Sequence, residues 1–168
     1  IKADAADPPA GADGDLPAGS VTERSLIEDY ARHVRTFLGD TTGQRPLRIV
    51  ADTANGMGGL VVPRVFEGLP FELEMLFGEL DGTFPNHPAD PIQPENLRDL
   101  QTRVIATGAD VGLAFDGDAD RVFLVDEKAQ PVSGSLTTAM VAAGMLDRAG
   151  PGPVVHNLIC SKAVPEVI

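Results

Sequence analysis

The sequence is poor in aromatic residues, cysteine and positive charge, and each shortage narrows what the protein can do. Its 168 residues include no tryptophan, one tyrosine and one cysteine, Cys160. A single cysteine excludes an internal disulfide and is typical of a reducing compartment, so we expect a cytoplasmic protein. With 25 acidic and 13 basic side chains, the net charge is −12. This balance argues against a nucleic acid or an anionic membrane as partner, because both require a positively charged surface.

Long hydrophobic runs are also missing. No apolar run approaches the roughly 20 residues that span a bilayer. The first residues lack the charged-then-apolar order of a signal peptide. The chain starts with Ile1 rather than Met, which we interpret as a fragment of a longer protein. A hydrophobic content of 43% with 23% charged residues is typical of one globular domain with some residues left over.

The most informative stretch contains three aspartates at alternating positions followed by an arginine: Asp116, Asp118, Asp120 and Arg121. Apolar runs at 111–115 and 122–125 flank it, which indicates a strand, a tight loop and a second strand. Three carboxylates so close together repel one another, and their pKa values rise unless a cation lies among them. Gly117 and Ala119 have little or no side chain, so the backbone can curl and bring the oxygens together. Because Mg²⁺ prefers such hard oxygen ligands, we expect it to bind here.

The acidic stretch has two other possible interpretations, a solvated turn and a calcium-binding loop. Asp-Gly pairs also form solvated hairpin turns, but the regular spacing and the adjacent Arg121 favour a metal site. An EF-hand would start at Asp116 and place its last ligand at Glu127. Its sixth position would be Arg121, where that loop requires glycine, and the flanks read as strands rather than helices. The EF-hand is therefore excluded.

Four motifs in order resemble those of the α-D-phosphohexomutases, the phosphomannomutase/phosphoglucomutase family. They are residues 51–59 (ADTANGMGG), 82–91 (GTFPNHPADP), 96–100 (NLRDL) and 115–127 (FDGDADRVFLVDE). The resemblance runs from about Ser20 to the last residue. It implies that Asp116, Asp118 and Asp120 hold Mg²⁺ while Arg121 contacts a phosphate.

The same resemblance implies a parent enzyme that interconverts hexose 1-phosphate and 6-phosphate through a phosphoserine and a hexose bisphosphate. Its partner would be a phosphorylated hexose. Members of the family share four domains, and the serine lies in a Thr-Ala-Ser-His-Asn-Pro type loop that these 168 residues do not contain. The third domain's Gly-Glu-x-Ser-Gly-His type loop is absent too. We therefore expect a fragment centred on the second, metal-binding domain, inactive alone. A fragment of a phosphoglucosamine mutase and a stand-alone cation-binding or scaffolding domain remain alternatives.

Alternating strand and helix patterns predict an α/β fold, a three-layer domain with a mixed, mostly parallel sheet. We expect a flexible linker at 1–19, a helix at 20–40 from a preceding domain or connection, and the metal-binding domain at 41–150. Residues 151–168 would be the truncated start of a following α/β domain.

Within this frame, residues 47–52 and 71–77 read as strands, the second one half-exposed at a sheet edge. A Ser20–Glu23 capping box starts the first helix, Pro94 starts another, and Ser135 caps the helix after the acidic loop. An apolar strand at 154–160 would bury His156 and Cys160.

Three polar residues stay outside the predicted site, with their roles open. Asp52 ends a strand and is expected to accept N–H groups of the glycine-rich turn at 55–59. That turn lacks the full dinucleotide-binding spacing, because Val61 stands at the last glycine position, so we interpret it as a close strand-to-helix crossing. His87 is expected to stabilise its loop by hydrogen bonds, and Lys162 lies near a helix start where a phosphate could bind.

Overall fold

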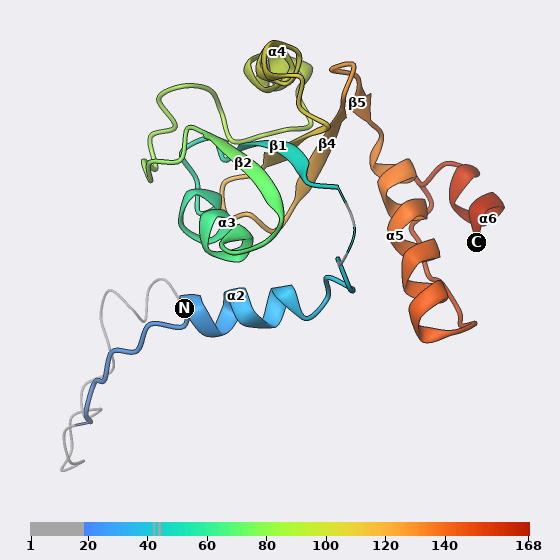
Figure 1. Ribbon diagram of the computed structural model, residues 1–168, viewed down its shortest axis with the longest axis horizontal. Coiled ribbons are helices and arrows are strands. Elements are labelled where there is room, and N and C mark those ends of the chain that lie inside the picture. Colours follow the sequence, from blue (N-terminus) through green and yellow to red (C-terminus); the bar gives the residue numbers. More distant parts are fainter. Residues whose placement is uncertain (1–18, 42, 44) are drawn as a thin grey trace, which may run out of the picture.

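The computed structural model describes residues 19–41, 43 and 45–168 (Figure 1). The predicted linker at 1–19 therefore lies, except for Gly19, outside the described residues. The elements follow one another in the order α2 (Ile27–Arg35), β1 (Leu47–Asp52), α3 (Gly58–Phe66), β2 (Phe71–Leu76), the 3-10 turn η1 (Pro94–Leu97), α4 (Arg98–Thr107), β3 (Val111–Phe115), β4 (Val122–Asp126), β5 (Pro131–Val132), α5 (Gly134–Ala149) and α6 (Ala163–Val167).

The five strands form one mixed sheet in the order β2-β1-β3-β4-β5. Strand β1 runs parallel to both of its neighbours, β2 and β3. Strand β4 is antiparallel to β3, because the loop from Asp116 to Arg121 between them is too short for a crossover. Strand β5 is antiparallel to β4. Four of the five strands thus run in the same direction and β4 opposes them. This confirms the predicted α/β fold with a mixed, mostly parallel sheet.

Helices cover both faces of the sheet and make three layers. Helix α4 lies on one face against β1 and β3, and α3 lies on the other (Figure 1). Helix α2 packs on the outside of α3, where the Arg35 guanidinium donates to the carbonyl oxygen of Val65 at 2.9 Å.

The hydrophobic core lies between α4 and the sheet. Its buried members are Val50, Leu97, Leu100, Val104, Ala109, Ala114 and Val125. Gly112 of β3 lets α4 approach, because a Cβ there would lie 2.9 Å from a methyl of Val104. Complete burial of Leu100 contributes about 1.5–3 kcal/mol. The core fixes the distance between α4 and the strands whose ends carry the site.

Several local predictions are confirmed. Strand β1 occupies 47–52 and β2 is an edge strand. Pro94 begins the turn that leads into α4, which ends at Gly108 in the left-handed conformation with φ 61°. A glycine adopts that conformation without the steric penalty of a Cβ.

Two predicted helix caps are wrong. Helix α2 begins at Ile27, and the Ser20–Glu23 segment lies outside it. A cap contributes only about 1 kcal/mol, and Val21 is 94% exposed, so extra turns there would bury nothing. Helix α5 is capped by Ser133, whose side chain accepts from the amide of Leu136 at 3.2 Å. Ser135 instead accepts from the amide of Ser161 at 3.0 Å.

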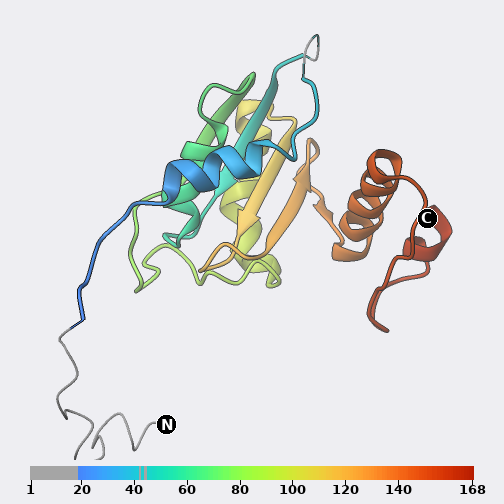
Figure 2. The same cartoon turned by 90° about the horizontal axis from the view of Figure 1, so that it is seen from below.

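The predicted strand at 154–160 is also wrong, since that segment is irregular. It lies next to α5 and α6 rather than at an edge of the sheet, so it has no strand to pair with (Figure 2). Consequently His156 is exposed, Cys160 is half-buried, and Leu158 is completely exposed. Among the described residues no helix is both long and apolar enough to cross a bilayer.

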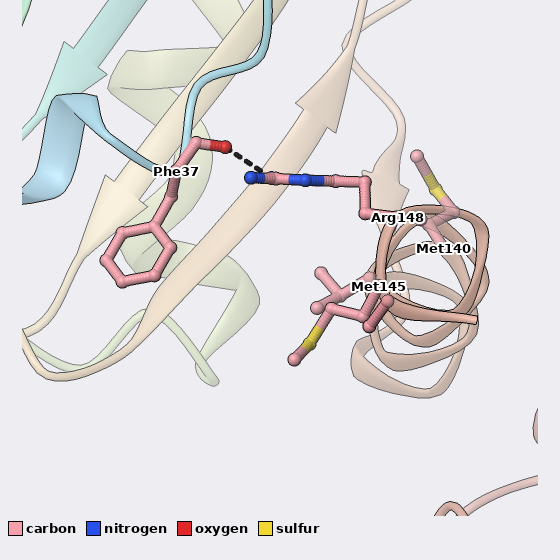
Figure 3. A pocket seen from close by; sticks show the side chains of 7 residues that line it. Phe37, Met140, Met145 and Arg148 are labelled. Atoms are coloured by element: carbon pink, nitrogen blue, oxygen red, sulfur yellow. Dashed lines mark hydrogen bonds between the residues drawn. The ribbon is translucent and has the colours of Figure 1, made fainter. Parts of the chain in front are cut away.

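Helices α5 and α6 pack against each other beyond β5, set off from the sheet (Figure 2). The Arg148 guanidinium of α5 reaches back towards α2 and donates to the carbonyl oxygen of Phe37 (Figure 3). Between Phe37 and α5 lies an open hollow of about 740 Å³ lined mainly by apolar side chains, including Met140 and Met145.

Candidate metal centre

The candidate site lies where β3 ends, at the edge of the sheet where β1 and β2 also end. In parallel sheets ligands bind beyond the carboxyl ends of strands. Asp52, the last residue of β1, pairs in register with Ala114 of β3. The loop from Asp116 to Arg121, called the acidic loop below, therefore begins next to the end of β1.

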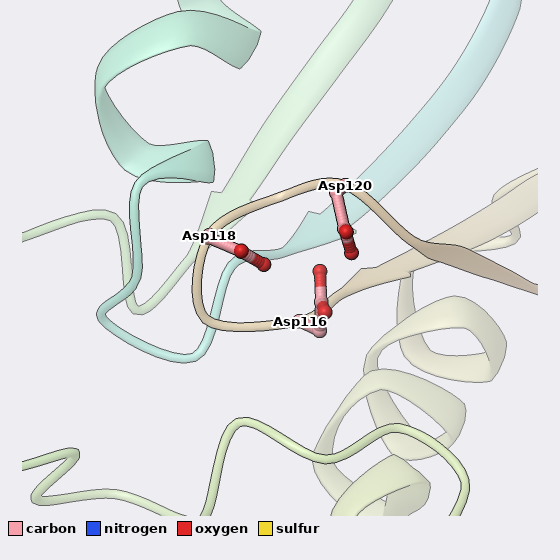
Figure 4. Close-up of side chains that lie close together, drawn as sticks. All are labelled: Asp116, Asp118 and Asp120. Atoms are coloured by element: carbon pink, nitrogen blue, oxygen red, sulfur yellow. The ribbon is translucent and has the colours of Figure 1, made fainter.

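The structure brings the three predicted aspartates together. Asp116, Asp118 and Asp120 each offer one carboxylate oxygen within 4.8 Å of the other two. Their side chains point into the space that the acidic loop encloses (Figure 4). Asp116 is buried, with 1% of its surface exposed, whereas Asp118 and Asp120 are exposed. The loop thus has one fixed carboxylate at its base and two on its rim.

Arg121 closes the loop on Asp116. Its backbone amide donates to one carboxylate oxygen of Asp116 at 3.1 Å, and its Nε donates to the other at 2.7 Å. The guanidinium also lies 3.4 Å from a carboxylate oxygen of Asp120. Burial would raise the pKa of Asp116, but the hydrogen bonds and positive charge of Arg121 outweigh it, so the pKa is lowered. The Asp116 carboxylate in turn raises the pKa of Arg121.

Ala119 and Gly117 are the two small residues that separate the three aspartates. Ala119 has a positive φ of 59°, and its amide donates to the carbonyl of Asp116 at 3.2 Å, which turns the chain back. A Cβ on Gly117 would lie 3.4 Å from Phe84 and 3.6 Å from Ala89, two residues of the loop that follows β2. These are ordinary contact distances, so that loop lies beside Gly117 without requiring a glycine there.

The glycine-rich turn after β1 supports the acidic loop from the other side. A Cβ on Gly56 would lie 2.6 Å from the carbonyl oxygen of Gly117, and the amide of Met57 donates to that oxygen at 2.9 Å. Gly59 packs in the same way against Gly78, which follows β2. A Cβ on Gly59 would lie 2.1 Å from the carbonyl oxygen of Gly78. The glycines are therefore explained by close backbone contacts, as the sequence predicted.

Two polar pairs fasten the loop at 79–93 to the end of β1. The Asn86 side chain donates to the Asn55 side chain at 2.7 Å. His87 Nε2 lies 3.1 Å from a carboxylate oxygen of Asp52, whose other oxygen accepts from the amide of Ala54 at 2.9 Å. The contacts of His87 agree with its predicted role in stabilising its loop. Asp52 accepts from Ala54, the residue before the turn at 55–59, rather than from the turn itself. The sequence missed the bond between Asp52 and His87, since no spacing signal connects side chains so far apart along the chain.

The donor set fits a hard divalent cation. Three carboxylates are the oxygen ligands that Mg²⁺ and Ca²⁺ take. An octahedral ion at about 2.1 Å from each oxygen needs neighbouring oxygens about 3 Å apart. The three oxygens now lie within 4.8 Å of one another. Rotation of the exposed Asp118 and Asp120 side chains would bring them to the shorter distance. Lys162 is the residue before α6, a helix that lies apart from the acidic loop (Figure 2).

The fold and the acidic loop define an α/β/α domain with a carboxylate-lined site beyond the carboxyl ends of its parallel strands. Residues 28–130 match the family model described as phosphoglucomutase/phosphomannomutase, alpha/beta/alpha domain II. The chain therefore belongs to the phosphoglucomutase/phosphomannomutase family, and it is centred on the second domain, as the sequence motifs predicted.

Curated relatives and a solved structure agree with this assignment. The chain is 37% identical to a phosphomannomutase/phosphoglucomutase of Pseudomonas putida over 153 residues, covering 91% of this chain and 32% of the relative. It is 42% identical to a probable phosphoglucosamine mutase of Methanopyrus kandleri, and the match covers 93% of this chain and 35% of the relative. The solved structure of a phosphoglucomutase/phosphomannomutase family protein of Burkholderia thailandensis superimposes with a TM-score of 0.79 at 33% identity. The match covers 90% of this chain and 33% of that protein. The chain thus spans about a third of the length of these relatives.

Proposed function

We propose that this chain supplies the Mg²⁺-binding segment of a phosphohexomutase, an isomerase that interconverts hexose 1-phosphate and hexose 6-phosphate. The observation that carries the proposal is the convergence of Asp116, Asp118 and Asp120 beyond β3 in a domain of this family. The complete reaction would use a phosphoserine and a hexose bisphosphate, in a protein that we assign to the cytoplasm. The 168 residues contain no serine loop of the family type, so the chain alone would not transfer phosphate.

Each residue of the acidic loop has a separate role in this proposal. Asp116 is the preformed ligand, because burial and Arg121 hold it as a fixed carboxylate. Asp118 and Asp120 would complete the ligand set from the rim. Bound Mg²⁺ supplies charge neutralisation for a phosphoryl group.

Arg121 would share its guanidinium between the loop and the substrate. Its side chain is 54% exposed although it binds Asp116, so its fork of donors is accessible to a phosphate. This role accounts for a permanent positive charge placed beside three carboxylates.

The sugar could be mannose or glucose phosphate, as in the Pseudomonas putida relative's name, or glucosamine phosphate, as in the Methanopyrus kandleri relative's name. We favour the first, with the phosphoglucosamine reaction as the alternative. Both share the metal-binding role proposed here, since they differ in the part that contacts the sugar.

The division into domains remains a prediction. Helix α5 packs on α6, and the family match ends at residue 130. Both observations support a boundary between β5 and α5, earlier than the predicted one at 150. The predicted role of 151–168 as the start of a following domain is compatible with either position.

Calorimetric titration of the chain with Mg²⁺ tests the proposal directly. We expect one site per chain, and the substitution Asp118→Asn should weaken it by about tenfold or more, by comparison with changes around other metal sites. Glu127→Gln is the matched control, because Glu127 is an exposed carboxylate beyond the opposite end of β4 that does not belong to the triad. Equal Mg²⁺ affinity for the parent and Asp118→Asn would contradict the assignment.

The activity is tested on the full-length protein that contains this chain. Mannose, glucose and glucosamine 1-phosphates are offered separately, with a hexose bisphosphate as activator, and conversion is followed by phosphorus NMR. Asp118→Asn should abolish conversion of the preferred substrate and Glu127→Gln should not. Absence of conversion for all three sugars would contradict the proposed reaction.

A further inference from the structure

Arg121 already occupies the carboxylate that forms the base of the proposed metal site. Its backbone amide donates to one oxygen of Asp116 at 3.1 Å, and its Nε donates to the other at 2.7 Å. The second guanidinium nitrogen, Nη2, also lies 2.7 Å from that other oxygen. The guanidinium therefore fills a position beside Asp116 that another cation would otherwise take.

The same guanidinium contacts a second member of the triad. Its Nε lies 3.4 Å from a carboxylate oxygen of Asp120. Asp116 is 1% exposed in its side chain, and a carboxylate so deeply buried requires a positively charged partner. Without a metal ion, Arg121 is the cation that balances this part of the loop.

Arg121 and a metal ion would compete whichever Asp116 oxygen the ion takes. Mg²⁺ lies about 2.1 Å from its ligand oxygens, so an ion on either oxygen stays within the screening length of about 8 Å from the guanidinium. The two positive charges repel each other, and a carboxylate shared between them binds each more weakly. This competition does not require the guanidinium to leave Asp116.

We propose that Arg121 is the built-in counter-ion of the acidic loop, which stabilises the loop without metal and lowers its affinity for Mg²⁺ by competing for Asp116. The inference rests on the proposed metal-binding function, which it deepens by naming what limits the affinity. It also differs from a purely supporting role, because the loss of a residue that only orients a ligand weakens metal binding.

The contact gives Arg121 two effects of opposite sign. Without metal, removal of its charge leaves the buried Asp116 carboxylate without its cation, which destabilises the folded chain. With metal present, the ion then meets three carboxylates and no competing positive charge. Lower stability in a chelator together with tighter Mg²⁺ binding is therefore the expected signature.

Two substitutions of Arg121 separate its charge from its shape. Arg121→Gln removes the charge and keeps the backbone amide bond to Asp116, whereas Arg121→Lys keeps the charge without the planar fork of donors. The side chain is 54% exposed, so neither change touches the core.

Arg45→Gln is the matched control. Arg45 also pairs with an aspartate, Asp110, which precedes β3 just as Asp116 follows it. The five residues of β3 separate the two pairs by roughly 17 Å, about twice the screening length of ~8 Å. The control therefore removes the same charge from the chain without acting on the acidic loop.

The experiment is a calorimetric Mg²⁺ titration of the full chain and its variants at one pH and ionic strength. Arg121→Gln should bind Mg²⁺ about tenfold more tightly than the parent, the factor by which a unit charge a few ångströms away repels a divalent ion even in water. Arg121→Lys and Arg45→Gln should stay close to the parent. Equal or weaker binding by Arg121→Gln would overturn the proposal, as would the same gain in either of the other two variants.

Urea denaturation in a chelator supplies a readout without metal. Arg121→Gln should unfold at a lower urea concentration than the parent, and an unchanged midpoint would overturn the counter-ion role.

The titrations also distinguish this inference from the proposed function. If the parent binds no Mg²⁺ and Arg121→Gln does, the proposed function fails and the counter-ion stands. If both bind equally, the function stands and the inference fails. If neither binds, both fail.

Discussion

The amide of Met57 donates a hydrogen bond to the carbonyl oxygen of Gly117 at 2.9 Å. This bond joins the turn after β1 to the acidic loop at a point between Asp116 and Asp118. Gly56 lies directly against the same carbonyl group. The position of the aspartates is therefore set in part by the glycine-rich turn, a segment from a different region of the sequence.

Gly56→Ala should damage this contact. Its Cβ would lie 2.6 Å from the Gly117 oxygen, and overpacking of this kind costs typically about 1–3 kcal/mol. Urea denaturation should show that loss of stability, together with weaker Mg²⁺ binding. Gly144→Ala in α5 is the control, since a Cβ there has open space and alanine favours a helix by about 1 kcal/mol. A Gly56→Ala chain as stable as the parent would mean that the turn can move away without cost.

Asp116 and Asp118 should differ in their effect on stability without metal. Asp116→Asn removes charge-assisted bonds from Arg121 to a buried group, which should cost about 1–3 kcal/mol. Asp118 is exposed, so Asp118→Asn should change the free energy of unfolding by less than about 0.5 kcal/mol. Both are compared by urea denaturation in a chelator. Equal destabilisation by both substitutions would contradict the distinction between a fixed base and a mobile rim.

Asp110 should make stability depend on acid pH. Its carboxylate binds the Arg45 guanidinium and the Arg48 amide, which lower its pKa from 3.8 to about 2. Because the folded-state pKa lies below the unfolded value, the contribution is fully present above pH 3.8 and is lost as the pH falls towards about 2. The difference in unfolding free energy between the parent and Asp110→Asn should shrink across that window. A difference that stays constant down to pH 2 would disprove the assignment.

Helix α5 should exchange its amide hydrogens faster than β1 and β3. The central strands lie in the core, whereas α5 has two buried residues, Ala139 and Ala142. Segments with few buried contacts open without global unfolding. Hydrogen-exchange mass spectrometry of the whole chain measures this directly. Equal protection of α5 and β1 would argue for one cooperative unit.

The sequence predicted those parts of the structure that local patterns determine. The half-exposed edge strand β2 and the Pro94 start before α4 each reflect a local preference of the residues present. The convergence of Asp116, Asp118 and Asp120 was predictable for a similar reason, since a short loop between two strands can place alternate side chains on one side.

Other features depend on partners that the sequence does not identify. The bond between His87 and Asp52 exists because the end of β1 and the loop after β2 meet in space. The segment at 154–160 has the apolar composition of a strand, yet pairing requires a neighbouring strand at its side. The helix expected from Ser20 starts at Ile27, because tertiary packing on α3 outweighs the capping signal.

The arrangement of α5 has a mechanical consequence. The helix leaves the sheet at the two-residue strand β5, and its far end is attached through Arg148 to the carbonyl of Phe37. Sixteen residues make a rod of about 24 Å. If the Arg148–Phe37 hydrogen bond broke, a rotation of the helix by about 10° at Ser133 would move its far end by roughly 4 Å. A slight change near β5 therefore becomes a large displacement of the residues that follow α5.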